Sequence, residues 1–364
     1  MPEINPWGSE LVTDYDKLFK EFGLQPITPE LLKKIGLDYR GFRRGIIFAH
    51  RDFDKFVEAT EKGRKTAVMS GIKPSSEFHL GSKMTAEEII YLQKRFGSTV
   101  FYAVADYESY ADNGISFEDA HEFAVDNVAD LLALGLDEKN AVIYKQSECL
   151  NVMRLGHVFS NKVTPNMMTA LYGHQKTGLY NAVFIQMADI LQPQLKQFGG
   201  ANFTVVPVGV DQDPHIRLTR DIAGRTKTEF GFIPPAATYH KFFRALNGET
   251  KMSKRDPMNV LTLNDSPELV KKKVNRALTG GRDTEKEQRE KGGDIKKCVV
   301  YELMLYHFYE DDLALEDMKD ECLQGKILCG ECKLKRIKVI QDYLKKHQEK
   351  KKKMQSKARK ILEQ

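Results

Sequence analysis

Two short stretches of the 364-residue chain carry residues that could bind a phosphate group. In the first, a strand-like apolar run ends at Ser70-Gly71, a polar loop over residues 73–76 follows, and His79 and Gly81 lead into a helix-like segment. Such a junction brings backbone N–H groups and the positive end of a helix dipole together, which suits a phosphate. Gly71 and Gly81 would let a flat, charged ligand approach the backbone. An ordinary turn of an α/β domain would have the same sequence pattern, so this stretch alone does not identify a phosphate site.

The second stretch, KMSKR at residues 251–255, follows a turn that contains Gly248. Lys251 and Lys254 lie three residues apart and can hold a polyphosphate as mobile point charges, which suits a departing pyrophosphate. A short basic loop is common by itself. Together the two stretches predict a nucleotide site.

The elements that must position these residues follow a β–α–β alternation. Buried strand-like runs at 66–69, 99–105, 141–144 and 203–208 alternate with helix-like segments at 85–96, 116–134 and 215–223. This alternation predicts an α/β fold with a doubly wound, Rossmann-like parallel sheet and right-handed crossovers. Polar groups at 106–110 and 211–214 follow two of the strands, at the sheet edge where ligands bind.

The pattern divides the chain into three regions. We expect an N-terminal extension over residues 1–60, with helices at 14–23 and 29–34 and a buried apolar segment within 38–51, packed on the core. A catalytic domain over 61–265 follows, with a helix-rich insertion at 149–200. Residues 266–364 read as an all-α domain with helices at 266–278, 299–309 and 333–362.

Composition and charge narrow the class of protein. No run of about eighteen apolar residues and no signal-peptide pattern is present, which predicts a soluble, cytoplasmic protein without a membrane partner. The net charge of +5 is uneven, because residues 333–364 carry +10 and the rest of the chain −5. A basic tail is either a solvated helix or a means to attract a polyanion.

Four of the five cysteines lie close in sequence and suggest a metal site. Cys298, Cys322, Cys329 and Cys332 form a C-x23-C-x6-C-x2-C pattern, with Cys149 apart. Zinc and iron–sulfur clusters both accept four thiolates. Spacing alone favours zinc, and unligated buried cysteines remain an alternative.

These motifs together resemble a known family. HLGS at 79–82 resembles the first signature of class I aminoacyl-tRNA synthetases, and KMSKR at 251–255 resembles the second. PSSEFHLG at 74–81, DQDPHIRLTRDIA at 211–223, KMSKRDP at 251–257 and GGRDTEKEQREKGG at 280–293 are similar to tryptophanyl-tRNA synthetases of the archaeal and eukaryotic branch. The resemblance extends from Arg44 to near the end of the chain.

The resemblance implies that ATP, with Mg²⁺ on its pyrophosphate, activates the amino acid before its transfer to tRNA. It makes His79, Lys251 and Lys254 the catalytic donors to the phosphates. The implied ATP contacts are Gly71, Pro74, Ser75, His79, Gly81, Lys251, Met252, Ser253 and Lys254. Ser82 and Arg255 depart from the two signatures and are left without a role.

The amino-acid side of the site departs further from that branch. Met69 and Ala103 stand where its members carry a tyrosine and a glutamine that contact the indole. QMADIL at 186–191 instead looks like a helix of bacterial tryptophanyl enzymes whose aspartate accepts the indole N–H, which maps that role to Asp189; by its pattern alone, Asp189 could equally be exposed or capping. The implied amino-acid contacts are Met69, Glu108, Gln186, Asp189 and Gln212, with Gln212 and Glu108 holding the α-amino group.

The resemblance also bears on partners and on the cysteines. A nearly identical cysteine spacing occurs in tryptophanyl enzymes with a [4Fe–4S] cluster, which favours a cluster over zinc here. It implies tryptophan and tRNA(Trp) as partners, no DNA, a homodimer through the sheet domain, and anticodon binding by residues 266–364. The Lys345–Lys360 tract would contact RNA phosphates or simply be solvated. A tyrosyl enzyme and a catalytically reduced, RNA-binding paralogue are the alternatives.

Overall fold

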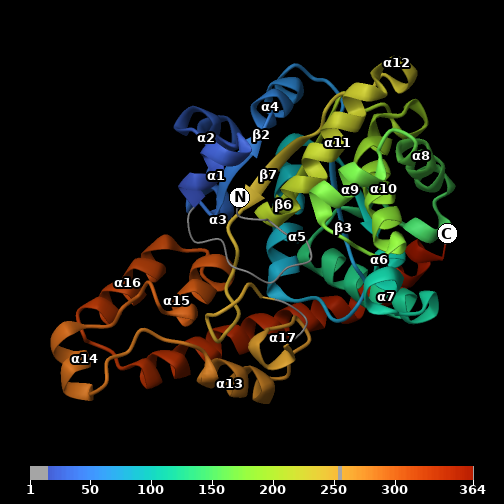
Figure 1. The fold of residues 1–364 in the computed structure, drawn as a ribbon. Helices are drawn as coiled ribbons and strands as arrows, with labels where there is room; N and C mark the ends of the chain where they lie inside the picture. Colours follow the sequence, from blue (N-terminus) through green and yellow to red (C-terminus); the bar gives the residue numbers. More distant parts are fainter. Residues whose placement is uncertain (1–14, 253–255, 364) are drawn as a thin grey trace.

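A seven-stranded sheet runs through the upper part of the molecule in the computed structural model, which describes residues 15–252 and 256–363 (Figure 1). Its strand order is β1-β2-β7-β6-β3-β4-β5. The five strands from β7 to β5 are parallel, and β1 and β2 join this edge antiparallel. The strands are β1 Gln25–Pro26, β2 Ile47–Arg51, β3 Thr66–Ile72, β4 Thr99–Val104, β5 Ala141–Lys145, β6 Phe203–Gly209 and β7 Ala236–His240.

The chain reverses its direction across the sheet at β3. It runs outward from β3 through β4 to β5, returns to pair β6 with the other side of β3, and continues to β7. This confirms the predicted doubly wound α/β fold. The crevice at the carboxyl ends of β3 and β6 is the switch point at which such folds bind ligands.

Both faces of the sheet are covered, because alternate side chains of a strand point to opposite faces. Val68, Val100 and Val205 pack in one apolar cluster with side chains of the helices α4 and α5. Ala67, Met69 and Phe101 belong to a second cluster on the other face. A strand buried on both faces reads as a continuous apolar run, which is why the sequence reveals these strands.

The helices mostly begin and end where their capping residues predict. Gly135 ends α7 with a positive φ of 110°, a conformation that costs glycine little. α5 begins at Leu80 rather than at the predicted residue 85, because His79 caps it. The helices are α1 Tyr15–Phe22, α2 Pro29–Ile35, α3 Arg40–Arg43, α4 Phe53–Glu61, α5 Leu80–Phe96, α6 Asp106–Asn113, α7 Phe117–Leu134, α8 Leu150–Ser160, α9 Pro165–Tyr172, α10 Thr177–Leu191, α11 Asp213–Arg225, α12 Lys227–Phe230, α13 Pro267–Arg276, α14 Glu285–Lys291, α15 Val299–Leu303, α16 Asp312–Leu323 and α17 Cys329–Leu362, and a π-helical turn covers Met304–Phe308.

The N-terminal region does more than pack on the core. The apolar segment expected within 38–51 contains the strand β2, which pairs with β7 with His50 opposite Thr238. β1 pairs with β2 in turn. The region therefore adds two strands to the sheet.

The C-terminal helix α17 joins the lower, helical part of the molecule to the sheet domain (Figure 1). Its 34 residues span about 50 Å. Ala358 and Leu362 pack in one apolar cluster with Val128 of α7. Lys351 Nζ lies 2.8 Å from the buried Asp130 carboxylate, and the Arg359 guanidinium lies 2.7 Å from Glu122. Part of the basic tract therefore forms ion pairs that dock the helix on α7.

Candidate active site

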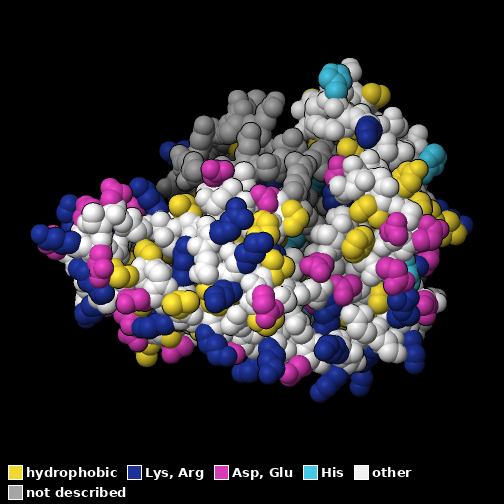
Figure 2. All heavy atoms as spheres, turned by 90° about the horizontal axis from the view of Figure 1, so that it is seen from below, with side chains coloured by type: hydrophobic (Ala, Val, Ile, Leu, Met, Phe, Trp, Pro, Cys, Tyr) yellow, Lys and Arg dark blue, Asp and Glu magenta, His cyan; other side chains and the backbone are white. Residues whose placement is uncertain are grey.

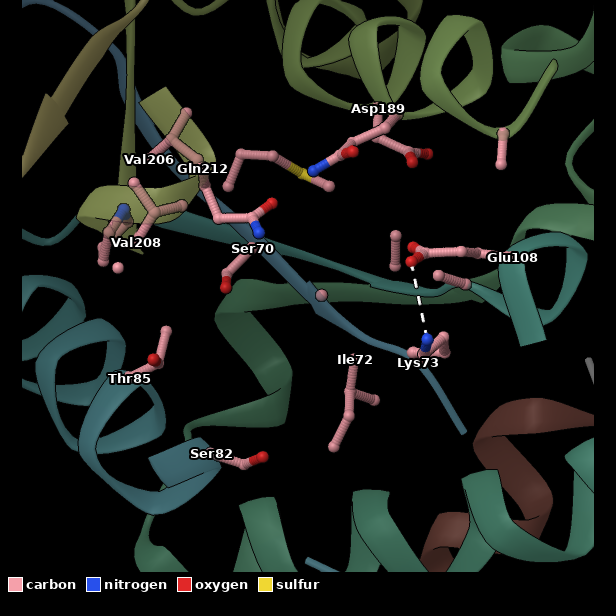
Figure 3. A pocket seen from close by; sticks show the side chains of 18 of the residues that line it. Ser70, Ile72, Lys73, Ser82, Thr85, Glu108, Asp189, Val206, Val208 and Gln212 are labelled. Atoms are coloured by element: carbon pink, nitrogen blue, oxygen red, sulfur yellow. Dashed lines mark ion pairs between the residues drawn. The ribbon is translucent and has the colours of Figure 1, made fainter. Parts of the chain in front are cut away.

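A cavity of about 430 Å³ opens at the carboxyl ends of β3, β4 and β6 (Figure 3). An adjoining cavity of about 240 Å³ extends over the start of α5. Both contain His79, Lys251 and Met252, so the two predicted signature stretches meet at one site. Two backbone hydrogen bonds join the first stretch to the segment that follows the second: Leu80 N donates to Leu261 O at 3.1 Å, and Leu263 N donates to Phe78 O at 2.9 Å.

His79 is held by the helix that it begins. Its Nδ1 accepts a hydrogen bond from the backbone N–H of Ser82 at 3.3 Å. A backbone N–H can only donate, so in the neutral ring the proton sits on Nε2. Nε2 lies 3.5 Å from Ser82 Oγ, beside the N-terminus of α5. The ring thus presents an N–H donor where the helix dipole favours negative charge.

Lys251 meets a carboxylate at the end of β6. Its Nζ lies 2.5 Å from Asp211 Oδ2 and 5.3 Å from the centre of the Phe242 ring. A phosphate that binds Lys251 must therefore compete with Asp211. The partners Ser253 and Lys254 proposed for the same phosphates lie outside the described residues.

Asp189 lies deep in the larger cavity and is only 2% exposed. Tyr144 Oη donates to its Oδ1 at 2.8 Å, and Gln146 Nε2 donates to its Oδ2 at 2.6 Å. Burial raises the pKa of Asp189 to about 7, while these two hydrogen bonds oppose the rise. A carboxylate has room for more than two donors, so Asp189 can accept a further N–H from a ligand.

Tyr144 and Gln146 are site residues that the sequence analysis did not single out. Tyr144 belongs to β5, and Gln146 directly follows that strand. Their signal was present, because polar side chains at the carboxyl end of a parallel strand face the ligand edge. They fix the Asp189 carboxylate before any ligand binds.

Most of the other predicted site residues line the same two cavities. Gln212, Ser70 and Asp189 all line the larger cavity, and in the view of Figure 3 both Gln212 and Asp189 lie above Ser70. Pro74 lines neither cavity; its carbonyl accepts a 2.8 Å hydrogen bond from Ser109 Oγ and so fixes the loop. The predicted residues in the larger cavity are Met69, Gly71, Ser75, His79, Glu108, Gln186, Asp189, Gln212, Lys251 and Met252, and Gly81 lines the smaller one.

Glu108 has charged neighbours in this cavity. Lys73 Nζ lies 3.7 Å from Glu108 Oε1 and 2.5 Å from Asp112 Oδ2 (Figure 3 marks the first pair). Lys73 follows β3, and both carboxylates belong to α6. The cavity therefore holds a cation between two anions at one wall.

The four clustered cysteines line a separate cavity of about 20 Å³ in the helical part. Cys298 caps α15, Cys322 lies in α16, and Cys329 and Cys332 lie in the first turn of α17. A Cβ added to Gly281 or Gly293 would meet the sulfur of Cys329 or Cys322 at 3.0 or 2.8 Å. Burial raises the pKa of the Cys332 thiol to about 11. The pattern thus brings the four side chains to one place, but within the described part of the chain no three His, Cys, Asp or Glu side chains are already arranged to hold a metal ion.

The described helices also bear on the membrane prediction. In residues 15–252 and 256–363, none is both long enough and apolar enough to cross a bilayer.

Comparisons with known proteins agree with the geometry. The sequence matches the family of class I tRNA synthetases for W and Y over residues 61–345. It is 44% identical to the tryptophan–tRNA ligase of Hyperthermus butylicus, over 95% of this chain and 94% of that protein. The structure superposes on the tryptophanyl-tRNA synthetase of Aeropyrum pernix with a TM-score of 0.92 and 43% identity, covering 98% of both chains. The Plasmodium falciparum tryptophanyl-tRNA synthetase superposes with a TM-score of 0.87 and 31% identity over 96% of both chains.

Proposed function

The chain belongs to the class I tRNA synthetases for tryptophan and tyrosine, and from this premise we propose that it is a tryptophan–tRNA ligase. The observation that carries the choice of tryptophan is the near full-length similarity to tryptophan-specific relatives. A buried carboxylate at the end of a 430 Å³ cavity agrees with a substrate whose side chain carries one N–H donor.

The reaction has two steps and needs no protein nucleophile. A carboxylate oxygen of tryptophan attacks the α-phosphorus of ATP, the bond to the β-phosphate oxygen breaks, and pyrophosphate leaves with its charge. A ribose hydroxyl of the tRNA then attacks the activated carbonyl, loses its proton, and releases AMP. Catalysis rests on positioning and on stabilising the charge of the phosphates.

We assign the phosphates to the junction of β3 and α5. The Nε2–H of His79 and the ammonium groups of Lys251 and Lys254 donate to them, and Mg²⁺ enters with the phosphates of ATP. Gly71 and Gly81 line the two cavities beside the nucleotide, and Ser75, Met252 and Ser253 complete its contacts. Pro74 acts through the loop that it fixes, since its carbonyl bonds to Ser109.

We assign the amino acid to the other end of the cavity. Asp189 accepts the indole N–H, and Met69 contributes an apolar wall that cannot do so. Gln212 and Glu108 face the α-amino group, and Gln186 lies on the same helix as Asp189, one turn earlier. A site that bonds a buried donor of its substrate rejects analogues that lack the donor by large factors.

Amino-acid-dependent ATP–pyrophosphate exchange, with tryptophan and tyrosine in parallel, tests this function. We expect exchange with tryptophan and at least about 100-fold less with tyrosine at equal concentration. Exchange with tyrosine would identify a tyrosyl enzyme. No exchange with either, together with retained tRNA binding, would identify a non-catalytic RNA-binding paralogue.

The helical region after residue 265 is proposed to bind tRNA(Trp). Besides the cations that dock α17, the tract exposes Lys345, Lys346, Lys350, Lys352, Lys353 and Lys360, and Figure 2 shows Lys and Arg side chains along the face seen from below. Changing Lys352 and Lys353 to Gln should raise the KM for tRNA and reduce the salt dependence of binding by about two counterions. Pyrophosphate exchange without tRNA should not change. An unchanged salt dependence of tRNA binding would exclude Lys352 and Lys353 from contact with the tRNA phosphates.

A homodimer through the sheet domain is proposed as the working form, in the cytoplasm. β5 forms one edge of the sheet, and Val142 on it and Leu150 at the start of α8 are 36% and 52% exposed. Apolar side chains beside a strand edge favour association. Light scattering should give twice the chain mass for the wild type and the monomer mass for the Val142→Lys, Leu150→Lys double variant. A monomeric wild type would contradict the proposal.

The four cysteines are proposed to hold a metal centre. The donor set fits four-thiolate ligation, and the two glycines leave space beside the sulfurs. The cavity has room for about one water-sized atom, which is enough for a single zinc ion. The sequence pattern favours a [4Fe–4S] cluster, and the cavity walls would have to move apart to hold it. Bound metal would join α15, α16 and α17. Anaerobic purification followed by iron and zinc analysis distinguishes these possibilities. Stoichiometric zinc would exclude the cluster, and the absence of both metals would exclude a metal centre.

A further inference from the structure

Lys73 brings a positive charge into the larger cavity at a place that the motifs do not explain. Lys73, Glu108 and Asp112 form a cluster at one wall, and their side chains are 26%, 26% and 23% exposed. The 2.5 Å distance from Lys73 Nζ to Asp112 Oδ2 is a hydrogen bond, whereas the 3.7 Å distance to Glu108 Oε1 is longer than one. Lys73 thus donates to Asp112 and has Glu108 as a second acidic neighbour.

The backbone keeps this cluster in place. Ala105 N donates to Ile72 O at 2.8 Å, which joins the ends of β3 and β4. Ser109 Oγ donates to Pro74 O at 2.8 Å, which joins the loop after Lys73 to the helix that carries Glu108. Lys73 and Glu108 are therefore presented by two segments that are bonded to each other on both sides of Lys73.

The charge pattern of the cluster fits a zwitterion better than a polyphosphate. One cation and two carboxylates leave one excess negative charge, which repels a triphosphate. An amino acid instead brings an ammonium group and a carboxylate on the same carbon atom, and each meets an opposite charge. In Figure 3, Lys73 and Glu108 lie on the same side of the cavity as Asp189, whereas Ser82 and Thr85 of the phosphate-facing helix lie on the other side.

We propose that Lys73 binds the α-carboxylate of the amino acid while Glu108 receives its α-ammonium group and Asp112 keeps Lys73 in place. Lys73 holds one carboxylate oxygen and leaves the other directed at the α-phosphorus. This inference rests on the proposed function, because it requires that the cavity bind an amino acid. It adds Lys73 to the residues that touch the substrate.

Calorimetric titration with three ligands tests it: tryptophan, tryptamine, which lacks the carboxylate, and indole-3-propionate, which lacks the ammonium group. Lys73→Met should weaken tryptophan and indole-3-propionate about 10- to 100-fold, the cost of a lost charged hydrogen bond, and leave tryptamine within about twofold. Glu108→Gln should show the complementary pattern, weakening tryptophan and tryptamine. Lys65→Met, an exposed lysine just before the same strand, is the matched control and should change none of the three.

Equal weakening of tryptamine and tryptophan by Lys73→Met would overturn the proposal, as would an effect confined to ATP binding. Lys73→Arg keeps the charge and should retain most of the preference for tryptophan over tryptamine, which separates a charge effect from a folding defect. If the wild type activates tryptophan but Lys73→Met binds it normally, this inference alone fails. If the wild type neither binds nor activates tryptophan, the proposed function fails.

Discussion

The two ends of the active-site cavity are prepared for their ligands in different ways. At the amino-acid end, Asp189 is buried and both of its oxygens already accept hydrogen bonds from Tyr144 and Gln146. At the end proposed to bind the phosphates, Lys251 is paired with Asp211, and ATP bound as proposed would replace that partner. One end is fixed before binding, and the other exchanges an internal contact for the substrate.

This difference separates selection from catalysis. A fixed acceptor loses little entropy when the correct donor arrives, so it contributes directly to affinity and discrimination. In the proposed mechanism, lysine side chains stabilise the charge that develops as pyrophosphate leaves, so they contribute mainly to rate. Substitutions at the two ends should therefore change different kinetic constants.

The largest effect is expected from Lys251→Ala. Loss of a donor to the departing pyrophosphate should lower the kcat of exchange about 10²- to 10³-fold, with the KM for tryptophan nearly unchanged. Lys227→Ala removes an exposed lysine of the same domain and should have wild-type kinetics. Wild-type exchange by Lys251→Ala would remove this lysine from the catalytic step.

Asp189→Asn should raise the KM for tryptophan about 10- to 100-fold, as expected for a lost charge-assisted hydrogen bond, with a smaller change in kcat. The variant should remain folded. The folded pKa of Asp189 lies above the ordinary value of 3.8, so its ionisation opposes folding above about pH 4, and a neutral amide removes that cost. Thermal melting at pH 8 checks the fold, and Asp221→Asn, an exposed carboxylate, is the control. An unchanged KM would place the indole elsewhere.

The pH dependence of kcat/KM for tryptophan offers an independent test of Asp189. Because the pKa of the Asp189 carboxyl in the ligand-free protein is about 7, the fraction of the ionised form, which accepts the indole N–H, declines below that pH. We expect kcat/KM to fall up to about tenfold per pH unit below 7. In Asp189→Asn this fall in kcat/KM should be absent. If it persists in the variant, another titrating group causes it.

A smaller effect is expected from Tyr144→Phe. Removing one neutral donor should raise the KM for tryptophan about 2- to 10-fold. The hydroxyl also lowers the pKa of Asp189, so the step in the pH profile should move to higher pH. Tyr110→Phe, whose side chain is 57% exposed, is the matched control. A lowered inflection would contradict the role given to Tyr144.

The sequence predicted four of the five parallel strands, β3 to β6 but not β7, and the meeting of the two signature stretches, because buried strands and strand-end polar residues leave a local pattern. It singled out Asp189 but not its partners Tyr144 and Gln146. Those partners lie in β5 and directly after it, more than forty residues before Asp189, and their approach depends on how β5 and α10 lie relative to each other. The local sequence pattern does not show which residues that are distant in sequence come into contact.

Other differences have similar causes. The strand β2 was expected only as a buried segment, because its pairing with β7 joins residues almost 190 positions apart. The helices α14 and α16 were not among the predicted helices of this region; α14 is short and polar and lies between glycines. Three cations of the basic tract have partners on or near α7 that periodicity cannot show. The four cysteines that the pattern grouped line one cavity, and their binding of a metal stays a prediction, since spacing alone does not encode it.

Single-turnover formation of the adenylate tests the separation of selection and catalysis most directly. The rate of pyrophosphate release is measured against tryptophan concentration at saturating ATP for the wild type, Asp189→Asn and Lys251→Ala. We predict that Asp189→Asn shifts the half-saturating tryptophan concentration about 10- to 100-fold with a nearly unchanged plateau rate. Lys251→Ala should lower the plateau about 10²- to 10³-fold at an unchanged half-saturation. Equal changes of both quantities in both variants would contradict the account.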